Sequence, residues 1–379
     1  MGATTPGWRS LADPEAKGRA MRSRLGRWAL AVLSAVLVAA PAANAVLDGP
    51  ATAGPAAVPI GTAAWRADPR HLPDPATATP AAVHAALAGA PRSLATRYPG
   101  VVGELDGAPI ALRYQANRAA MAAAGAPYAG WHGRYLLFDP RGDGRVAQVF
   151  GDLSTADRIA VLVPGVDDRL ANFRRGLGGK AYRSPAVQAA NLYRASGARI
   201  AVIAWLGYAT PRGVGIDAAR ERLAATGAVA LRRFVAGLTA VRPHATIALL
   251  GHSYGSTVLG LAARYLPRQV TDIALFGSPG VGVGTASALH TPARVWAGQS
   301  TKDWIRYVPG LRLFGFGHGR KPADPAFGAR IFPTADVGDH DHYLAPGTDS
   351  LAALARIALG PGHFAPARTA LAASGGGAA

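Results

Sequence analysis

The sequence predicts an α/β fold built on a mostly parallel, doubly wound sheet with helices on both faces. Short aliphatic runs alternate along the chain with longer helical stretches, and this alternation is typical of such sheets. Most runs are apolar at consecutive positions, which indicates strands covered on both faces. Because ligands of these sheets bind at the carboxyl ends of the strands, we expect the functional residues there.

The individual elements follow from the same pattern. The runs rich in β-branched and aliphatic residues predict strands at 146–150, 159–163, 199–205, 246–251, 272–277, 294–298 and 330–334. The helical stretches between and around them cover 109–124, 185–196, 216–241, 254–266 and 349–359.

The beginning of the chain has the layout of an export signal. Basic residues from Arg22 to Arg27 precede an apolar stretch over 28–40, and a small-residue triplet ends at Ala45. We therefore predict a signal peptide over 1–45 that is cleaved after Ala45, and a secreted or envelope-associated protein. An uncleaved signal-anchor is the alternative, because the uncharged stretch is long enough to span a bilayer.

The remaining chain divides into three parts by composition. Residues 46–82 are rich in proline and alanine and predict an extended linker or a surface arm. Residues 83–362 carry the ordered pattern of the predicted α/β domain. Residues 363–379 end in a run of glycine and alanine that predicts a flexible tail.

Charge and cysteine content restrict the classes of function. The chain has 379 residues, a net charge of +18 and no cysteine, so it has no disulfide, thiolate nucleophile or cysteine metal site. The basic surplus favours weak association with anionic envelope components. Its basic residues are scattered, without a block of five like charges, so we predict no nucleic-acid partner.

The motif Gly251-His252-Ser253-Tyr254-Gly255 stands between a predicted strand and a predicted helix. This is the context of a nucleophile elbow, in which a sharp turn exposes the serine hydroxyl and the two glycines leave room for the turn. The start of the following helix also directs backbone NH groups at a developing oxyanion. We predict Ser253 as a nucleophile and the NH of Tyr254 as one oxyanion donor.

A second oxyanion donor is expected from an earlier strand. The strand at 159–163 ends in Pro164-Gly165, which lets the backbone turn inward. The NH of Val166 is therefore the predicted partner of the Tyr254 NH.

A serine nucleophile needs a base and an orienting carboxylate, in the chain order Ser, Asp or Glu, His. Before residue 320, the carboxylates downstream of Ser253 are Asp272 and Asp303. Asp272 opens a strand, at the end away from the site, whereas Asp303 follows the strand at 294–298. We predict Asp303 as the acid.

The predicted base is His340, which follows the last strand and precedes the terminal helix. His342 is the alternative, because residues two apart face the same way in an extended segment. His290 precedes a strand and is a weak candidate, and His318 is placed to line the mouth of the substrate site.

The cluster Asp339-His340-Asp341-His342 has a second interpretation as a metal site, since imidazole and carboxylate are ordinary metal ligands. It lacks further ligands and a zinc-binding helix motif, so we predict neither a metal nor a cofactor. Other side chains flank the predicted site, and the candidates for the walls of its substrate pocket are His252, Trp205, Tyr208, Trp304 and His318.

The stretches GHSYGS, VPGV, AWLGY, FGSPGVGV, GQSTKD and GDHDHY together resemble the α/β-hydrolase superfamily, specifically a branch of actinobacterial serine-hydrolase-like proteins. The resemblance covers about residues 109–360. It implies an α/β-hydrolase fold, a triad of Ser253, Asp303 and His340, and hydrolysis of a small-molecule or lipid-like acyl substrate. The alternative function is a catalytically silent envelope protein of this fold that binds anionic polymer.

Overall fold

The computed structural model describes residues 58–313 and 316–361. The predicted signal peptide, the first part of the proline-rich arm and the predicted tail lie outside the described residues. All elements below belong to one compact unit of the chain.

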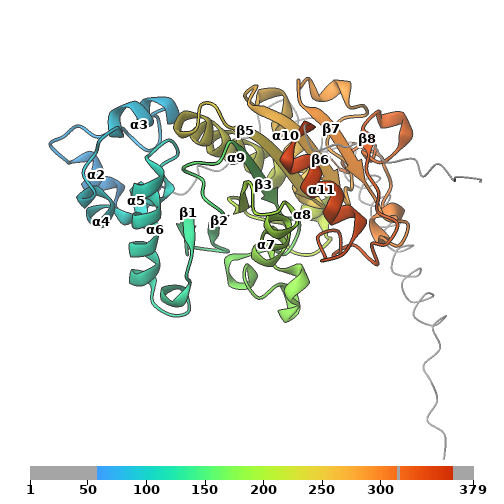
Figure 1. Cartoon of the computed structure of the whole chain (residues 1–379), viewed down its shortest axis with the longest axis horizontal. Helices are drawn as coiled ribbons and strands as arrows, with labels where there is room; N and C mark the ends of the chain where they lie inside the picture. Colours follow the sequence, from blue (N-terminus) through green and yellow to red (C-terminus); the bar gives the residue numbers. More distant parts are fainter. Residues whose placement is uncertain (1–57, 314–315, 362–379) are drawn as a thin grey trace, which may run out of the picture. The chain divides into compact units, whose positions relative to one another are not determined.

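Eight strands form a single sheet in the order β1-β2-β4-β3-β5-β6-β7-β8 (Figure 1). The pairs β1–β2 and β2–β4 are antiparallel, and all pairs from β4 to β8 are parallel. The strands are β1 Arg134–Asp139, β2 Arg145–Phe150, β3 Arg158–Val163, β4 Ala201–Leu206, β5 Thr246–His252, β6 Val270–Phe276, β7 Arg294–Gly298 and β8 Arg330–Ile331.

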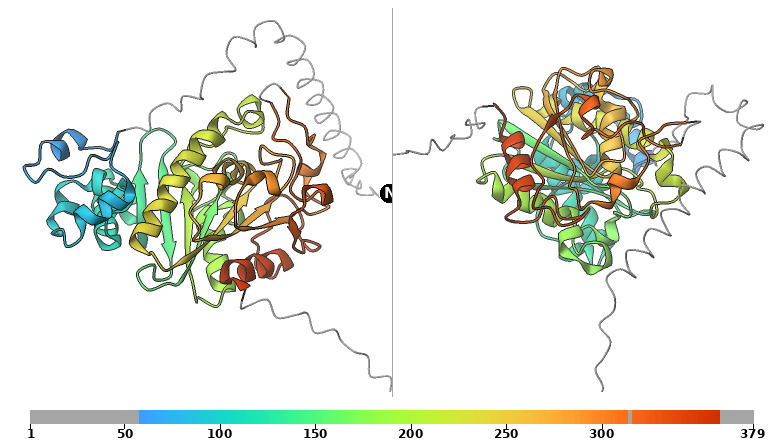
Figure 2. Two further views of the ribbon diagram at one scale, coloured as in Figure 1. Left: turned by 90° about the horizontal axis from the view of Figure 1, so that it is seen from above. Right: turned by 90° about the vertical axis from the view of Figure 1, so that its right-hand side faces the viewer.

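Helices cover both faces of this sheet, as the sequence predicts (Figure 2). Helices α9 (Arg222–Val241) and α10 (Tyr254–Ala262) bury one face, and α7 (Pro185–Ala195) and α11 (Asp349–Leu359) bury the other. Alternate residues of a central strand enter the two cores: Val161 faces α9 and α10, whereas Leu162 faces α7 and α11. Both are buried, which explains why the strands are apolar at consecutive positions.

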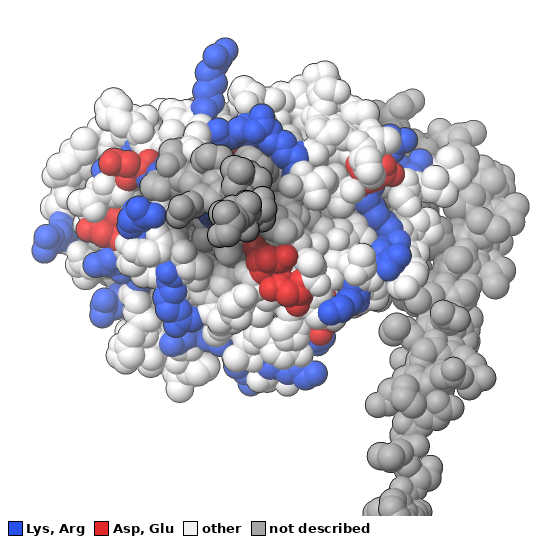
Figure 3. All heavy atoms as spheres, turned by 45° about the vertical axis from the view of Figure 1, so that its right-hand side comes forward, with Lys and Arg blue, Asp and Glu red and all other residues white. Residues whose placement is uncertain are grey.

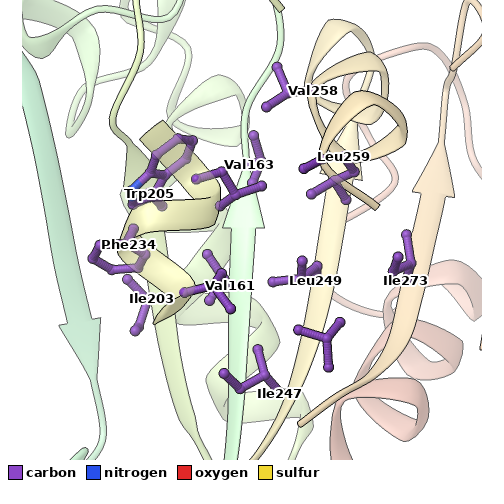
Figure 4. Close-up of a cluster of buried hydrophobic side chains, with 14 of the residues drawn as sticks. Val161, Val163, Ile203, Trp205, Phe234, Ile247, Leu249, Val258, Leu259 and Ile273 are labelled. Atoms are coloured by element: carbon purple, nitrogen blue, oxygen red, sulfur yellow. The ribbon is translucent and has the colours of Figure 1, made fainter. Parts of the chain in front are cut away.

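The core under α9 and α10 gathers residues from four parallel strands (Figure 4). Val161, Ile203 and Leu249 line it from the sheet, and Phe234 and Leu259 close it from the helices. Each of the five side chains is at most 3% exposed. Full burial of an aliphatic side chain stabilises a fold by about 1.5–3 kcal/mol, so this layer fixes the strand ends that carry the site.

A group of short helices precedes the sheet. They are α2 Thr62–Arg66, α3 Pro80–Leu87, α4 Ser93–Arg97, α5 Pro99–Glu104 and α6 Ile110–Ala124. They enclose a separate apolar cluster around Trp65, which is fully buried and stacks edge-on against Tyr98. Residues 58–82, assigned from composition to a linker or arm, thus contain α2 and the beginning of α3.

The structure differs from the predicted elements in several places. Strand β1 was missed, because it lies at the antiparallel edge and depends on its pairing with β2. The helix predicted over 216–241 is split into α8 (Ile216–Ala219) and α9, since Arg220 has an extended backbone and pairs with Phe316. The last strand is two residues long instead of five, because Pro333 has no NH to continue the ladder.

Among the described helices, α9 is long and apolar enough to cross a membrane by length and composition. Its buried side chains pack into the core beside α10, which is the ordinary position of a core helix.

Candidate active site

Ser253 stands at the sharp turn between β5 and α10. Its backbone has φ 53° and ψ −127°, a conformation that non-glycine residues rarely adopt. A methyl group on Gly255 would lie 2.3 Å from the Val163 carbonyl oxygen, so a side chain there has no room. The sequence-predicted elbow is therefore the geometry that the structure adopts.

Three side chains meet at this turn, and each comes from a segment that follows the carboxyl end of a strand. His340 Nε2 lies 2.9 Å from Ser253 Oγ, and His340 Nδ1 lies 2.8 Å from Asp303 Oδ1 and 3.0 Å from Oδ2. Nδ1–H donates to the carboxylate, which leaves Nε2 as the acceptor of the serine proton. All three residues are less than 9% exposed, so the structure brings together the side chains predicted as nucleophile, acid and base.

Asp303 is held as a carboxylate by three donors. Burial favours the uncharged form, but hydrogen bonds from His340, the Ile305 NH and the Tyr343 hydroxyl outweigh it and hold the pKa of Asp303 below its usual value. The Tyr343 hydroxyl donates to Oδ2 at 2.7 Å and accepts the Ser300 NH at 2.9 Å. Sequence reasoning gave Tyr343 no role, because its contact with Asp303 spans 40 residues.

His252 supports the base from the elbow itself. Its Nε2–H donates to the main-chain oxygen of His340 at 2.8 Å, and its ring packs against Phe276 and Tyr343. Burial, together with the neighbouring His340, lowers the pKa of His252 to about 4, so the ring is neutral near pH 7. The structure therefore places His252 behind the base, whereas the sequence suggested a pocket wall.

His342, the alternative base, contacts residues other than Ser253. Its Nδ1 bonds Asp339 Oδ1 at 2.6 Å, and its ring stacks on Tyr182 with centroids 4.1 Å apart. Asp341 pairs with Arg183 at 2.5 Å. The four residues considered as a metal cluster thus do not converge on one point, and the described residues contain no group of three His, Asp or Glu side chains that could hold a metal ion.

The remaining candidates for acid and base lie outside the triad. Asp272, fully buried at the start of β6, pairs with Arg294 at 2.6 Å and accepts from the indole of Trp296. His290 is exposed beyond a short turn. His318 is buried behind Tyr254, and its Nε2–H donates to the Ala218 oxygen at 2.6 Å, so it is a packing residue instead of a wall of the substrate mouth.

The aromatic pocket candidates divide between the core and the site. Trp205 is 1% exposed and packs against Phe234 under α9, so its assignment to the pocket is wrong. Tyr208 is also buried, and its hydroxyl donates to the Pro164 oxygen at 2.7 Å, which anchors the β3 connection. Trp304 is half-buried with its ring 4.9 Å from that of His340, and it alone of the three flanks the reacting groups.

The connection after β3 runs directly beside the nucleophile. A methyl group on Gly165 would lie 2.7 Å from Ser253 Cβ and 3.2 Å from Oγ, so only glycine allows this approach. Val166 follows at once, and Tyr254 is the first residue of α10, where backbone NH groups have no partner within the helix. Both predicted oxyanion donors therefore belong to segments that adjoin Ser253.

A carboxyl group that the sequence reasoning missed lies in the same connection. Burial raises the pKa of Asp168 well above its ordinary value, and the nearby carboxylates of Asp341 and Asp167 raise it further. The surroundings of the β3 connection thus favour the uncharged form of this carboxyl group. Nothing in the motif pattern marks Asp168, because its surroundings come from a loop near residue 341.

Comparison with known proteins finds a similar family. A model of a protein family described as alpha/beta hydrolase matches residues 139–313, which include the elbow and the acid. Over these residues the chain matches the α/β-hydrolase family. The resemblance predicted from the sequence is confirmed, and so is the fold class. The match ends before His340, so the prediction of His340 as the base rests on the geometry above.

Proteins similar to this chain include uncharacterized mycobacterial proteins. One from Mycobacterium tuberculosis is 32% identical over 265 residues, which cover 60% of this chain and 39% of the relative. One from Mycobacterium bovis is 34% identical over 171 residues, covering 41% of this chain and 60% of the relative. The chain therefore spans less than two thirds of the length of either relative.

Two solved structures are also similar. An α/β serine hydrolase from Xanthomonas campestris is 16% identical and covers 59% of this chain and 92% of its own, with a TM-score of 0.37. A carboxylesterase from Mesorhizobium loti is 15% identical and covers 59% of this chain and 99% of its own, with a TM-score of 0.37.

Proposed function

We propose that this chain is an exported serine hydrolase that cleaves an ester or a related acyl bond through an acyl-enzyme. The observation that carries the proposal is the continuous hydrogen-bonded line from Ser253 Oγ through His340 to Asp303. Export is proposed from the leader pattern of residues 1–45.

In the proposed mechanism, His340 Nε2 takes the proton of Ser253 as Oγ attacks the acyl carbon. The carboxylate of Asp303 keeps Nδ1 protonated and stabilises the imidazolium that forms. The NH groups of Val166 and Tyr254 stabilise the oxyanion, and a donor of this kind contributes about 3 kcal/mol in the transition state. His340 then protonates the leaving group, and the acyl-enzyme forms.

Deacylation repeats the same steps with water. His340 Nε2 removes a proton from a water molecule, whose oxygen attacks the acyl carbon, and Ser253 Oγ departs with the proton from His340. The cycle needs no cofactor. The strained turn at Ser253 favours this function over a catalytically silent envelope protein, because such strain persists only where the surrounding structure maintains it.

The test is turnover of nitrophenyl acyl esters of graded chain length by the purified chain and by Ser253→Ala. We expect measurable hydrolysis with a clear optimum in acyl length, and a loss of at least about 10⁴-fold in kcat for the variant. Ser154→Ala, at an exposed serine in the loop after β2, is the matched control and keeps full activity. Equal turnover by Ser253→Ala and the unaltered chain would refute the assignment.

A further inference from the structure

Two surface segments expose large apolar side chains. In the β7–β8 connection, Tyr307, Leu311 and Leu313 are 59%, 71% and 53% exposed. In the β4–α9 connection, Val214 and Ile216 are 45% and 63% exposed. These five, called the apolar rim below, make up half of the ten large apolar side chains exposed in the part of the chain that the structure describes.

The two segments lie side by side. The Gly317 NH donates to the Ala219 oxygen at 2.8 Å, and Arg312 pairs with Glu221 at 2.7 Å. The apolar rim is therefore carried by one continuous surface, although its residues are about 100 positions apart in the chain. Exposed apolar side chains grouped in this way mark interaction surfaces more often than single ones do.

This surface borders the reacting groups at both of its ends. The β7–β8 connection begins with Trp304, whose ring lies 4.9 Å from that of His340. It returns at His318, whose ring lies 5.6 Å from that of Tyr254, the residue after the nucleophile. The connection that carries Tyr307, Leu311 and Leu313 is therefore anchored at both ends against residues of the candidate site.

The same connection is strongly basic. No carboxylate occurs between Asp303 and Asp324, and Arg306, Arg320 and Lys321 line a cavity of about 590 Å³ in which Asp324 is the one acidic residue. Over the face shown in Figure 3, lysine and arginine are scattered among other residues. Net charge alone therefore does not indicate a partner. The combination of basic side chains, a cavity and exposed apolar side chains in one connection indicates one.

We propose that the apolar rim binds the surface of an anionic phospholipid layer, with its apolar side chains among the acyl chains and the basic cavity around a lipid phosphate. Exposed leucine and tyrosine beside arginine and lysine are the composition of peripheral membrane-binding surfaces. Leucine side chains contribute little to binding a free phosphate. This binding is independent of hydrolysis, and so is its test.

The absence of cysteine from the chain makes a local measurement available. In the full chain carrying Ser253→Ala, which prevents lipid cleavage, Leu311→Cys receives a single environment-sensitive fluorophore. With vesicles of phosphatidylcholine and phosphatidylglycerol, we expect a blue shift and at least a twofold rise in emission. Val229→Cys, at a 55% exposed position on α9, is the matched control and keeps the emission of a label in water.

Charge variants test the basic cavity in the same assay. Arg306→Ser and Arg320→Ser are each expected to weaken vesicle binding about fivefold, whereas Arg199→Ser, at an exposed arginine after α7, leaves it unchanged.

Three results would overturn the proposal. One is a label at position 311 that stays in water while the protein sediments with vesicles. Another is an equal response to phosphatidylcholine alone. The third is a shift that appears without lipid as protein concentration rises, which would assign the rim to a second copy of the chain. Loss of esterase activity changes none of these measurements, because they are made on the Ser253→Ala chain. The membrane-binding proposal and the proposed function can therefore be refuted independently.

Discussion

The nucleophile and the base of the candidate site are positioned in two different ways. Ser253 lies at the turn between β5 and α10, and the backbone itself closes this turn. The Ser253 NH donates to the Phe276 oxygen at 2.9 Å, Gly165 approaches Ser253 without a side chain, and Gly255 packs against the Val163 oxygen. His340 sits outside any helix or strand, in a connection that side chains hold from several sides.

The bonds that hold the base come from distant residues. Ser300 Oγ donates to the Val337 oxygen at 2.7 Å, Asn191 Nδ2 donates to the Leu344 oxygen at 2.9 Å, and His252 donates to His340 itself. Each such bond contributes about 1 kcal/mol. The elbow therefore tolerates almost no change in backbone shape, whereas several weak hydrogen bonds together hold His340 in position.

The largest expected effect on kcat separates His340 from His342, the two histidines in the connection between β8 and α11. His340→Ala removes the acceptor on Ser253 and should lower kcat by about 10⁴-fold or more. His342→Ala removes a ring that stacks on Tyr182 and should leave kcat within a few-fold of the unaltered chain. Steady-state kinetics on one acyl ester measures both, and the opposite ranking would make His342 the base.

A pair of glycine substitutions compares the stability of the elbow with that of the connection that carries His340. In Gly255→Ala the new methyl meets the Val163 and Pro164 oxygens at 2.3 and 2.6 Å, so we expect about 2–4 kcal/mol of lost stability. In Gly338→Ala, two residues before His340, the methyl meets nothing within 4 Å, and stability should change by less than about 0.5 kcal/mol. Denaturant unfolding measures both, and equal losses would contradict the difference.

The elbow could be predicted from the sequence because everything it needs is local: a buried strand, two glycines and a following helix. Asp303 could be singled out for a similar reason, since it lies in the connection that follows β7. The support of the base was not, because the partners of Asp303 and His340 come from Tyr343 and His252, far along the chain. Trp205 was misplaced because its burial depends on α9, which packs over it.

Tyr343→Phe tests the support of the acid. The substitution keeps the ring but removes the hydroxyl that donates to Asp303 and accepts the Ser300 NH. We expect about a tenfold lower kcat, with KM unchanged, because one charge-assisted bond contributes about 1.5–3 kcal/mol. A change in KM alone would show that Tyr343 acts on the substrate instead of on the triad.

His252→Gln tests the bond between the elbow and the base through pH. The folded-state pKa of His252 is about 4, below its ordinary 6.5, so the unfolded chain binds more protons between these values. The contribution of His252 to the free energy of unfolding is fully present above pH 6.5. It falls by up to about 3 kcal/mol as the pH drops to 4. Unfolding measured across this range should show a shallower decline for His252→Gln than for the unaltered chain, and parallel curves would contradict the assignment.

The same residue has a kinetic control. Glutamine can still donate to the His340 oxygen, whereas His252→Phe fills the space without a donor. We therefore expect the phenylalanine variant to lose more of kcat than the glutamine variant, and equal losses would show that the ring acts only by its volume.

Covalent labelling by a fluorophosphonate probe, followed by mass spectrometry of the peptides, tests most directly whether Ser253 is an activated nucleophile. We predict one adduct, on Ser253, that forms rapidly in the unaltered chain and in His342→Ala but slowly in His340→Ala. An adduct on another residue, or a folded protein that remains unlabelled, would contradict the account.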